Sequence, residues 1–135
     1  MRFVDTNVLL YAASTAPDES LKKERALAVL DSDDVAISVQ VLQEFYVQAT
    51  RRTKAERLSH GQAATLVESW LRFHVEEISV PLLRDAMASA ARWRISYWDA
   101  AIVEAARAAG CSTLLSEDLK DGMDFGGVRV LSPFA

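Results

Sequence analysis

Four acidic residues, Asp5, Glu44, Asp99 and Asp118, are the candidates for chemistry in this sequence. Carboxylate oxygens are the ligands that hard cations such as Mg²⁺ and Mn²⁺ prefer. A cation held in this way can activate a water molecule and bind a phosphate oxygen. If folding gathers these side chains, the sequence predicts metal-dependent hydrolysis of a phosphodiester.

Asp99 carries the strongest signal of the four. It lies in the first turn of a predicted helix, and its neighbours three and four positions on are Ile102 and Val103. Its side chain therefore projects from the apolar stripe that must face a sheet. The structural alternative is a capping pair with Ser96. That alternative explains an exposed Asp better than one on a buried stripe, so a functional role is favoured.

Asp5 and Glu44 each have a structural alternative of comparable weight. Asp5 follows the apolar pair Phe3-Val4 and precedes Thr6, where an Asp commonly caps a helix. Glu44 has valines three positions before and after it. A carboxylate near an apolar face is costly unless it is paired or bound to a metal, although a Glu at the edge of such a face often reaches solvent.

The fourth acidic position is open. Asp118 follows the run Leu114-Leu115-Ser116, but loop acids before Gly122 are ordinary turn chemistry. Glu117 and Asp121 are close rivals, and the sequence does not decide between them.

The elements that must position these acids alternate between short β-branched runs and longer amphipathic segments. This alternation predicts an α/β fold with a parallel sheet covered on both faces, whose functional groups collect at the carboxyl ends of the strands. The predicted strands are Phe3-Val4, 35–38, 75–78, 113–115 and 128–131. The predicted helices are roughly 7–13, 20–31, 39–53, 59–73, 80–93 and 97–109.

Gathering four carboxylates has an electrostatic consequence. At about 5 Å and an effective dielectric near 20, each ionised pair repels by about 3 kcal/mol. Some carboxylates must therefore hold protons, or a divalent cation must neutralise them.

Composition sets further bounds. The chain of 135 residues has room for one domain, 1–135, and its single Cys111 excludes an internal disulfide. Neither a signal peptide nor a bilayer-spanning stretch is evident, so a cytoplasmic protein with no membrane association is expected. The net charge of −4 argues mildly against binding RNA, unless positive charge is local or a partner supplies it.

At these acids the sequence resembles the PIN-domain ribonucleases, and most closely the toxin subunits of VapBC-type toxin–antitoxin pairs. Four segments carry the resemblance in order, and together they span nearly the whole chain. They are Phe3-Val4-Asp5-Thr6-Asn7-Val8-Leu9-Leu10, Ser38-Val39-Gln40-Val41-Leu42-Gln43-Glu44-Phe45-Tyr46, Tyr97-Trp98-Asp99-Ala100-Ala101-Ile102-Val103 and Leu114-Leu115-Ser116-Glu117-Asp118-Leu119.

The resemblance implies a three-layer α/β/α fold with a central, mainly parallel five-stranded sheet. It implies a homodimer that cleaves RNA with Mg²⁺ or Mn²⁺ and is inhibited by a cognate antitoxin protein. By position, Asp5, Glu44, Asp99 and Asp118 would be catalytic, with Asp5, Asp99 and Asp118 as metal ligands. Two hydroxyl groups, those of Thr6 and Ser116, would support them by hydrogen bonds.

Three other residues lie near the predicted site in sequence. Arg92 and Arg94 precede Ser96 and are the candidates for phosphate contact. Trp98 adjoins Asp99 and could stack on a base, but packing in the core is the favoured interpretation.

Competing functions fit less well. A receiver-like signalling domain needs adjacent acids after the first strand, and a phosphatase with an aspartyl nucleophile usually has a second Asp where this chain has Asn7. A catalytically inactive PIN-like module that binds RNA or protein remains the alternative, although all four acidic positions are filled.

Overall fold

The computed structural model describes residues 1–51 and 55–135, in which short strands alternate with helices. The strands are β1 Arg2–Val4, β2 Val35–Ser38, β3 His74–Glu76, β4 Thr113–Leu115 and β5 Arg129–Leu131. The helices are α1 Thr6–Ala12, α2 Ser20–Leu30, α3 Val39–Ala49, α4 His60–Trp70, α5 Val80–Trp93 and α6 Tyr97–Ala108, with a 3-10 turn at Pro17–Glu19.

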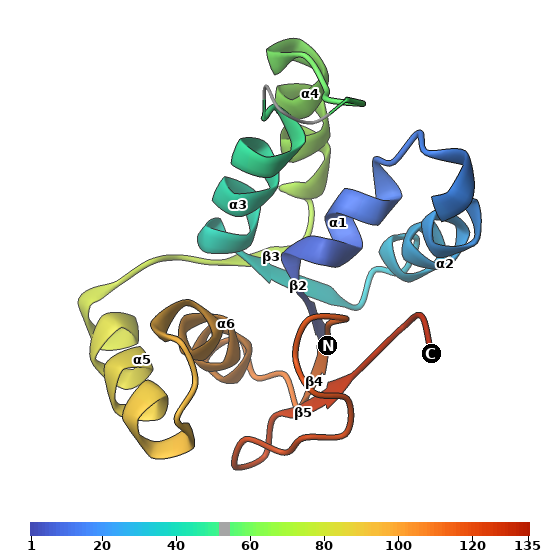
Figure 1. The fold of residues 1–135 in the computed structure, drawn as a ribbon. Helices are drawn as coiled ribbons and strands as arrows, with labels where there is room; N and C mark the ends of the chain where they lie inside the picture. Colours follow the sequence, from blue (N-terminus) through green and yellow to red (C-terminus); the bar gives the residue numbers. More distant parts are fainter. Residues whose placement is uncertain (52–54) are drawn as a thin grey trace.

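The five strands form one parallel sheet in the order β3-β2-β1-β4-β5. Figure 1 shows α5 and α6 on one side of this sheet and α1 and α2 on the other, while α3 and α4 lie side by side and project away from it. The predicted three-layer α/β/α fold with a five-stranded sheet is therefore confirmed, and every strand pair is parallel.

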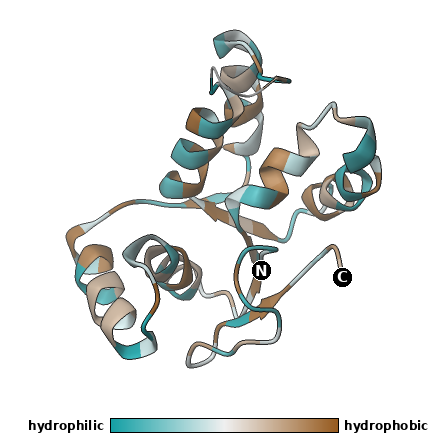
Figure 2. Ribbon diagram, viewed as in Figure 1, coloured by the Kyte–Doolittle hydropathy of each residue, from teal (hydrophilic) through white to brown (hydrophobic). Residues whose placement is uncertain are grey.

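The centre of the sheet is the core of the protein. Fully buried strand residues include Phe3, Ile37, Leu114 and Val130. Figure 2 shows hydrophobic residues along these strands and polar residues on the outer faces of several helices. Strands buried on both faces read as continuous apolar runs, which is why they could be located from the sequence.

Local signals set several helix ends as predicted. Ser59 and Gln62 form a complete capping box at the start of α4. Pro81 lies in the first turn of α5, where its missing N–H has no partner to lose. Gly110 follows α6 with a φ of 78°, in the left-handed region that favours glycine.

Two predicted helices are shorter in the structure. The helix predicted over 39–53 ends at Ala49, because the Ala49 carbonyl accepts the N–H of Leu58 as the chain returns. Residues 52 and 53 of that prediction lie outside the described residues. The helix predicted over 59–73 ends at Trp70, whose carbonyl accepts the N–H of Phe73 in a turn that leads into β3. In the described part of the chain, no helix is long and apolar enough to cross a bilayer.

Candidate active site

One cavity of about 70 Å³ is lined by all four candidate acids, Asp5, Glu44, Asp99 and Asp118. Asp5 directly follows β1, and Asp118 lies three residues beyond β4, the strand paired in parallel with β1. Because the two carboxyl ends meet at one edge of the sheet, the two acids come together. Glu44 on α3 and Asp99 on α6 project over the same edge. We call this the acidic cavity.

Asp5 is the most deeply buried of the four, at 7% exposure. Its Oδ1 accepts the N–H of Thr6 at 2.7 Å and so caps α1, while its Oδ2 accepts the hydroxyl of Ser116 at 2.8 Å. The pKa of Asp5 is raised to about 6, mainly by burial; the hydrogen bonds from Ser116 and Thr6 lower it, and the charges of Asp118 and Glu44 add to the increase. The capping role and a role in the cavity therefore coexist at this residue.

Glu44 is half-buried, and both of its oxygens are held. Thr6 Oγ1 donates to Oε2 at 2.8 Å, and Gln40 Nε2 donates to Oε1 at 2.9 Å. The same Gln40 nitrogen donates to the backbone carbonyl of Trp98 at 3.2 Å, so it ties α3 to the first turn of α6. Gln40 was not singled out from the sequence, although it lies one helical turn before Glu44 and shares its face.

Asp99 uses its backbone and its side chain for different purposes. Its N–H donates to Ser96 Oγ at 3.0 Å, which completes the predicted cap of α6. Within the described residues, no side chain or backbone group donates a hydrogen bond to its carboxylate, which lines the acidic cavity. Unlike the carboxylates of Asp5 and Glu44, this one is therefore not held by a hydrogen bond from another described residue.

The structure separates the three rivals for the fourth acidic position. Asp118 lines the acidic cavity. Glu117 instead forms an ion pair with Lys22 at 2.6 Å, and hydrogen bonds from Lys22 and Tyr11 lower its pKa although burial opposes them. Asp121 accepts the N–H of Ser132 at 2.8 Å. Geometry thus favours Asp118.

Ser116 and Asn7 connect the loop after β4 to α1. Besides donating to Asp5, Ser116 Oγ accepts from Asn7 Nδ2 at 3.3 Å and from the N–H of Asp118 at 3.2 Å. Asn7 Oδ1 accepts the N–H of Glu117 at 3.2 Å. Asn7 was not predicted as a site residue, but these bonds fix the loop that carries Asp118.

The donor set of the acidic cavity is composed of oxygens, with neither His nor Cys in its lining. Such a set fits a hard cation like Mg²⁺ or Mn²⁺ and does not favour Zn²⁺. In the described part of the chain, however, no three His, Cys, Asp or Glu side chains already converge closely enough to hold a metal ion. Binding a cation therefore requires the carboxylates of the acidic cavity to come closer together.

The two predicted phosphate-binding arginines do not line the acidic cavity. The guanidinium of Arg92 lies 4.5 Å from the ring centre of Trp93 and lines a separate cavity with Glu104 and Arg107, between α5 and α6. Arg94 is the exposed residue that ends α5, with a φ of 56°. Their contact with substrate stays a prediction.

The favoured interpretation of Trp98 as a core residue is wrong. Its side chain is 64% exposed, and the residue lines the acidic cavity beside Asp99. Ile102, four positions on, is buried on the same side of α6, so helix periodicity alone predicts burial at position 98; in the first turn of the helix, however, the Trp98 ring stays in solvent.

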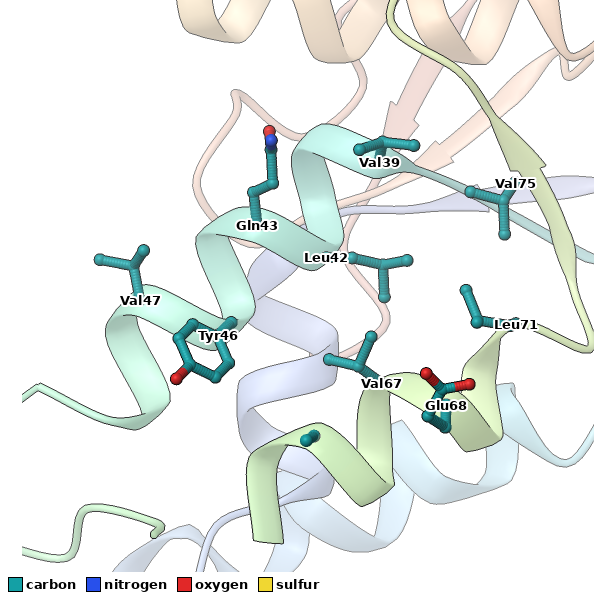
Figure 3. A pocket seen from close by; sticks show the side chains of 10 residues that line it. Val39, Leu42, Gln43, Tyr46, Val47, Val67, Glu68, Leu71 and Val75 are labelled. Atoms are coloured by element: carbon teal, nitrogen blue, oxygen red, sulfur yellow. The ribbon is translucent and has the colours of Figure 1, made fainter. Parts of the chain in front are cut away.

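Two further cavities flank these elements. A polar one of about 280 Å³ shares Asn7, Leu10, Gln48 and Asp118 with the acidic cavity. Figure 3 shows an apolar one of about 490 Å³ between α3 and α4, into which Leu42, Val67 and Leu71 contribute side chains. No candidate acid lines the apolar cavity, and its lining offers little to a phosphate or a metal ion.

Comparison with known families decides how this arrangement is classified. The family model described as PIN domain matches residues 2–120, which include all four acids. The chain belongs to the PIN domain family. A comparison with curated protein sequences gives no significant match.

Solved structures share this PIN fold at low sequence identity. A toxin–antitoxin complex from Klebsiella pneumoniae matches with a TM-score of 0.71 and 21% identity, covering 98% of each chain. VapC20 from Mycobacterium tuberculosis, described as a sarcin–ricin-loop-cleaving toxin, matches with a TM-score of 0.69 and 21% identity over 87% of this chain and 90% of that one. DNA-bound VapBC2 from Rickettsia felis matches with a TM-score of 0.66 and 17% identity over 97% of each chain.

Proposed function

We propose that this PIN-domain chain is a metal-dependent endoribonuclease that acts as a cytoplasmic toxin and is neutralised by a cognate antitoxin protein. The observation that carries the proposal is the acidic cavity, where Asp5, Glu44, Asp99 and Asp118 come from four separate elements of the fold. Membership of the PIN family supports nuclease chemistry, and the toxins among the structural neighbours support the biological role.

Three of the acids, Asp5, Asp99 and Asp118, would hold Mg²⁺ or Mn²⁺. Bound there, the cation would lower the pKa of a water molecule and offset charge on the phosphate. Burial and neighbouring charge make the ionised form of Asp5 costly without a counter-charge, which fits a site that is completed by a cation.

The remaining side chains orient the reacting groups. Thr6 and Gln40 fix the two oxygens of Glu44, so that this carboxylate presents its remaining lone pairs in one direction and can align the attacking water. In the same way, the hydroxyl of Ser116 donates to Oδ2 of Asp5 and orients that carboxylate. Residues that hydrogen-bond to metal ligands in this way commonly affect the affinity for the metal as well as the orientation of the ligands.

We also propose that the chain forms a homodimer. Large apolar side chains are exposed on α3 and α5, including Val47, Val80, Leu83 and Met87. Exposed apolar side chains that gather into one patch mark protein interfaces, and Val80, Leu83 and Met87 are spaced three and four positions apart along one face of α5. Light scattering on the purified chain should give twice the mass of 14.9 kDa.

Cleavage of a structured RNA by purified protein, free of any antitoxin, tests the proposed function. Wild-type protein should cut with Mg²⁺ or Mn²⁺ and not with EDTA. Asp5→Asn and Asp99→Asn should reduce the rate about 100-fold or more while the protein stays folded. The exposed Asp33→Asn is the matched control and should cut normally. A wild-type protein that binds RNA but never cuts it would favour the inactive binding module.

A further inference from the structure

Trp98 is more exposed to solvent than the other two tryptophans. Trp70 is 4% exposed, and Trp93 packs edge-on against Phe125 with ring centres 5.5 Å apart. Trp98 is 64% exposed, and its ring meets that of Tyr97 edge-on at 5.0 Å. Exposing most of an indole forgoes the free energy of burying a large apolar surface, so the position calls for an explanation.

The position of Trp98 is fixed relative to the acids. Gln40 Nε2 joins the Trp98 carbonyl, at 3.2 Å, to Oε1 of Glu44, at 2.9 Å. The cap from Ser96 to the N–H of Asp99 fixes the same helical turn. An exposed ring on a backbone held this firmly is preorganised, because binding need not order the segment that carries it.

We propose that Trp98 is a substrate-binding residue, whose indole stacks on the nucleobase of a nucleotide adjoining the phosphate in the acidic cavity. This inference rests on the proposed function, which places a phosphodiester among the carboxylates. A base is always attached within reach of that phosphate, and it presents an uncharged π-face that the surrounding carboxylates do not repel. Stacking on an aromatic side chain tolerates any base. Trp98 would therefore contribute affinity and position without choosing the sequence.

Trp98→Ala, Trp98→Phe and the control Leu21→Ala, which shortens an exposed side chain on α2, separate stacking from folding. An unstructured RNA of roughly 12 nucleotides serves as the probe, within the span of known single-strand sites. Trp98→Ala should raise KM about 10- to 100-fold with little change in kcat, and Trp98→Phe should raise it less than about threefold. The control should match wild type.

Intrinsic fluorescence provides a readout that does not depend on cleavage. With Ca²⁺ as the oxygen-binding cation, RNA should quench the wild-type indole emission saturably, and Trp98→Phe should lose this quenching. If wild-type protein never cuts RNA, the proposed function fails, and the inference is judged on RNA affinity and quenching alone. Normal cutting with an unchanged KM in Trp98→Ala, or quenching that persists in Trp98→Phe, overturns the inference. So does a Trp98→Ala protein whose oligomeric mass changes while its RNA binding does not, since the residue would then belong to a protein interface.

Discussion

The hydroxyl of Ser116 donates a hydrogen bond of 2.8 Å to Oδ2 of Asp5, between residues 111 positions apart in the chain. The two residues follow β4 and β1, which are neighbours in the sheet, so the bond joins two carboxyl ends. The same hydroxyl oxygen accepts the N–H of Asp118, so it also holds the loop that carries this acid. The side chain of Ser116 is thus hydrogen-bonded to two candidate metal ligands, Asp5 and Asp118.

Replacing this hydroxyl should weaken both the fold and the site. In Ser116→Ala the buried Asp5 carboxylate loses a donor, and Asn7 and the N–H of Asp118 lose an acceptor. We expect the free energy of unfolding to fall by about 1–3 kcal/mol. Cleavage should fall about 10- to 100-fold, as for residues that orient metal ligands. Urea unfolding and RNA cleavage measure the two effects, with the exposed Ser112→Ala as the control. A variant with unchanged cleavage would show that the bond does not orient Asp5.

The difference in stability between wild type and Asp5→Asn should depend on pH in a defined direction. The pKa of Asp5 rises from 3.8 to about 6 on folding, mainly through burial, so the folded state binds this proton more tightly than the unfolded chain. Its contribution to stability is therefore favourable at low pH, is lost as the pH rises through about 6, and stays lost above it. Asn keeps the capping ability of Asp.

Without divalent cations, Asp5→Asn should therefore be more stable than wild type above about pH 6, by up to about 3 kcal/mol. The advantage should shrink as the pH falls toward 3.8, the value for an unperturbed carboxyl. Denaturant unfolding across this range measures the difference. A variant that is less stable than wild type at every pH would contradict the raised pKa.

Two glutamines on α3 form a matched pair for the next prediction. Gln40 is buried and donates to Glu44 and to the Trp98 carbonyl, whereas Gln43 is exposed. Gln40→Ala should lower the free energy of unfolding by about 1–2 kcal/mol and cleavage about 10- to 100-fold, because Glu44 loses one of its two donors. Gln43→Ala should alter neither. Equal effects of the two substitutions, measured by unfolding and cleavage, would assign Gln40 no special role.

The fold and the gathering of the acids could both be predicted from the sequence, and for the same reason. Buried parallel strands are continuous apolar runs, and an acid such as Asp5 at the end of one must lie at the sheet edge where its neighbours also end. Asp99 could be assigned because its i+3 and i+4 neighbours defined the buried stripe of α6.

Other features depend on contacts between distant segments. The end of α3 at Ala49 is set by Leu58, which no local pattern reveals. Gln40 carries an amide like many others, and only the packing of α6 against this region gives it two partners. Trp98 was assigned to the core because a large aromatic side chain usually packs there, but at the first turn of α6 the rest of the fold leaves it exposed.

Cation binding by the intact protein tests the central claim most directly, because it does not depend on finding the right RNA. Calorimetric titration with Mn²⁺ at a pH well above 6, where Asp5 is ionised, should show saturable binding to wild type and to the exposed-acid variant Asp33→Asn. Affinity should fall at least about tenfold in Asp99→Asn, which removes a cavity carboxylate that no described residue holds by a hydrogen bond. Absence of saturable binding to wild type, or equal affinity in all three proteins, would contradict the claim that these acids form a cation site.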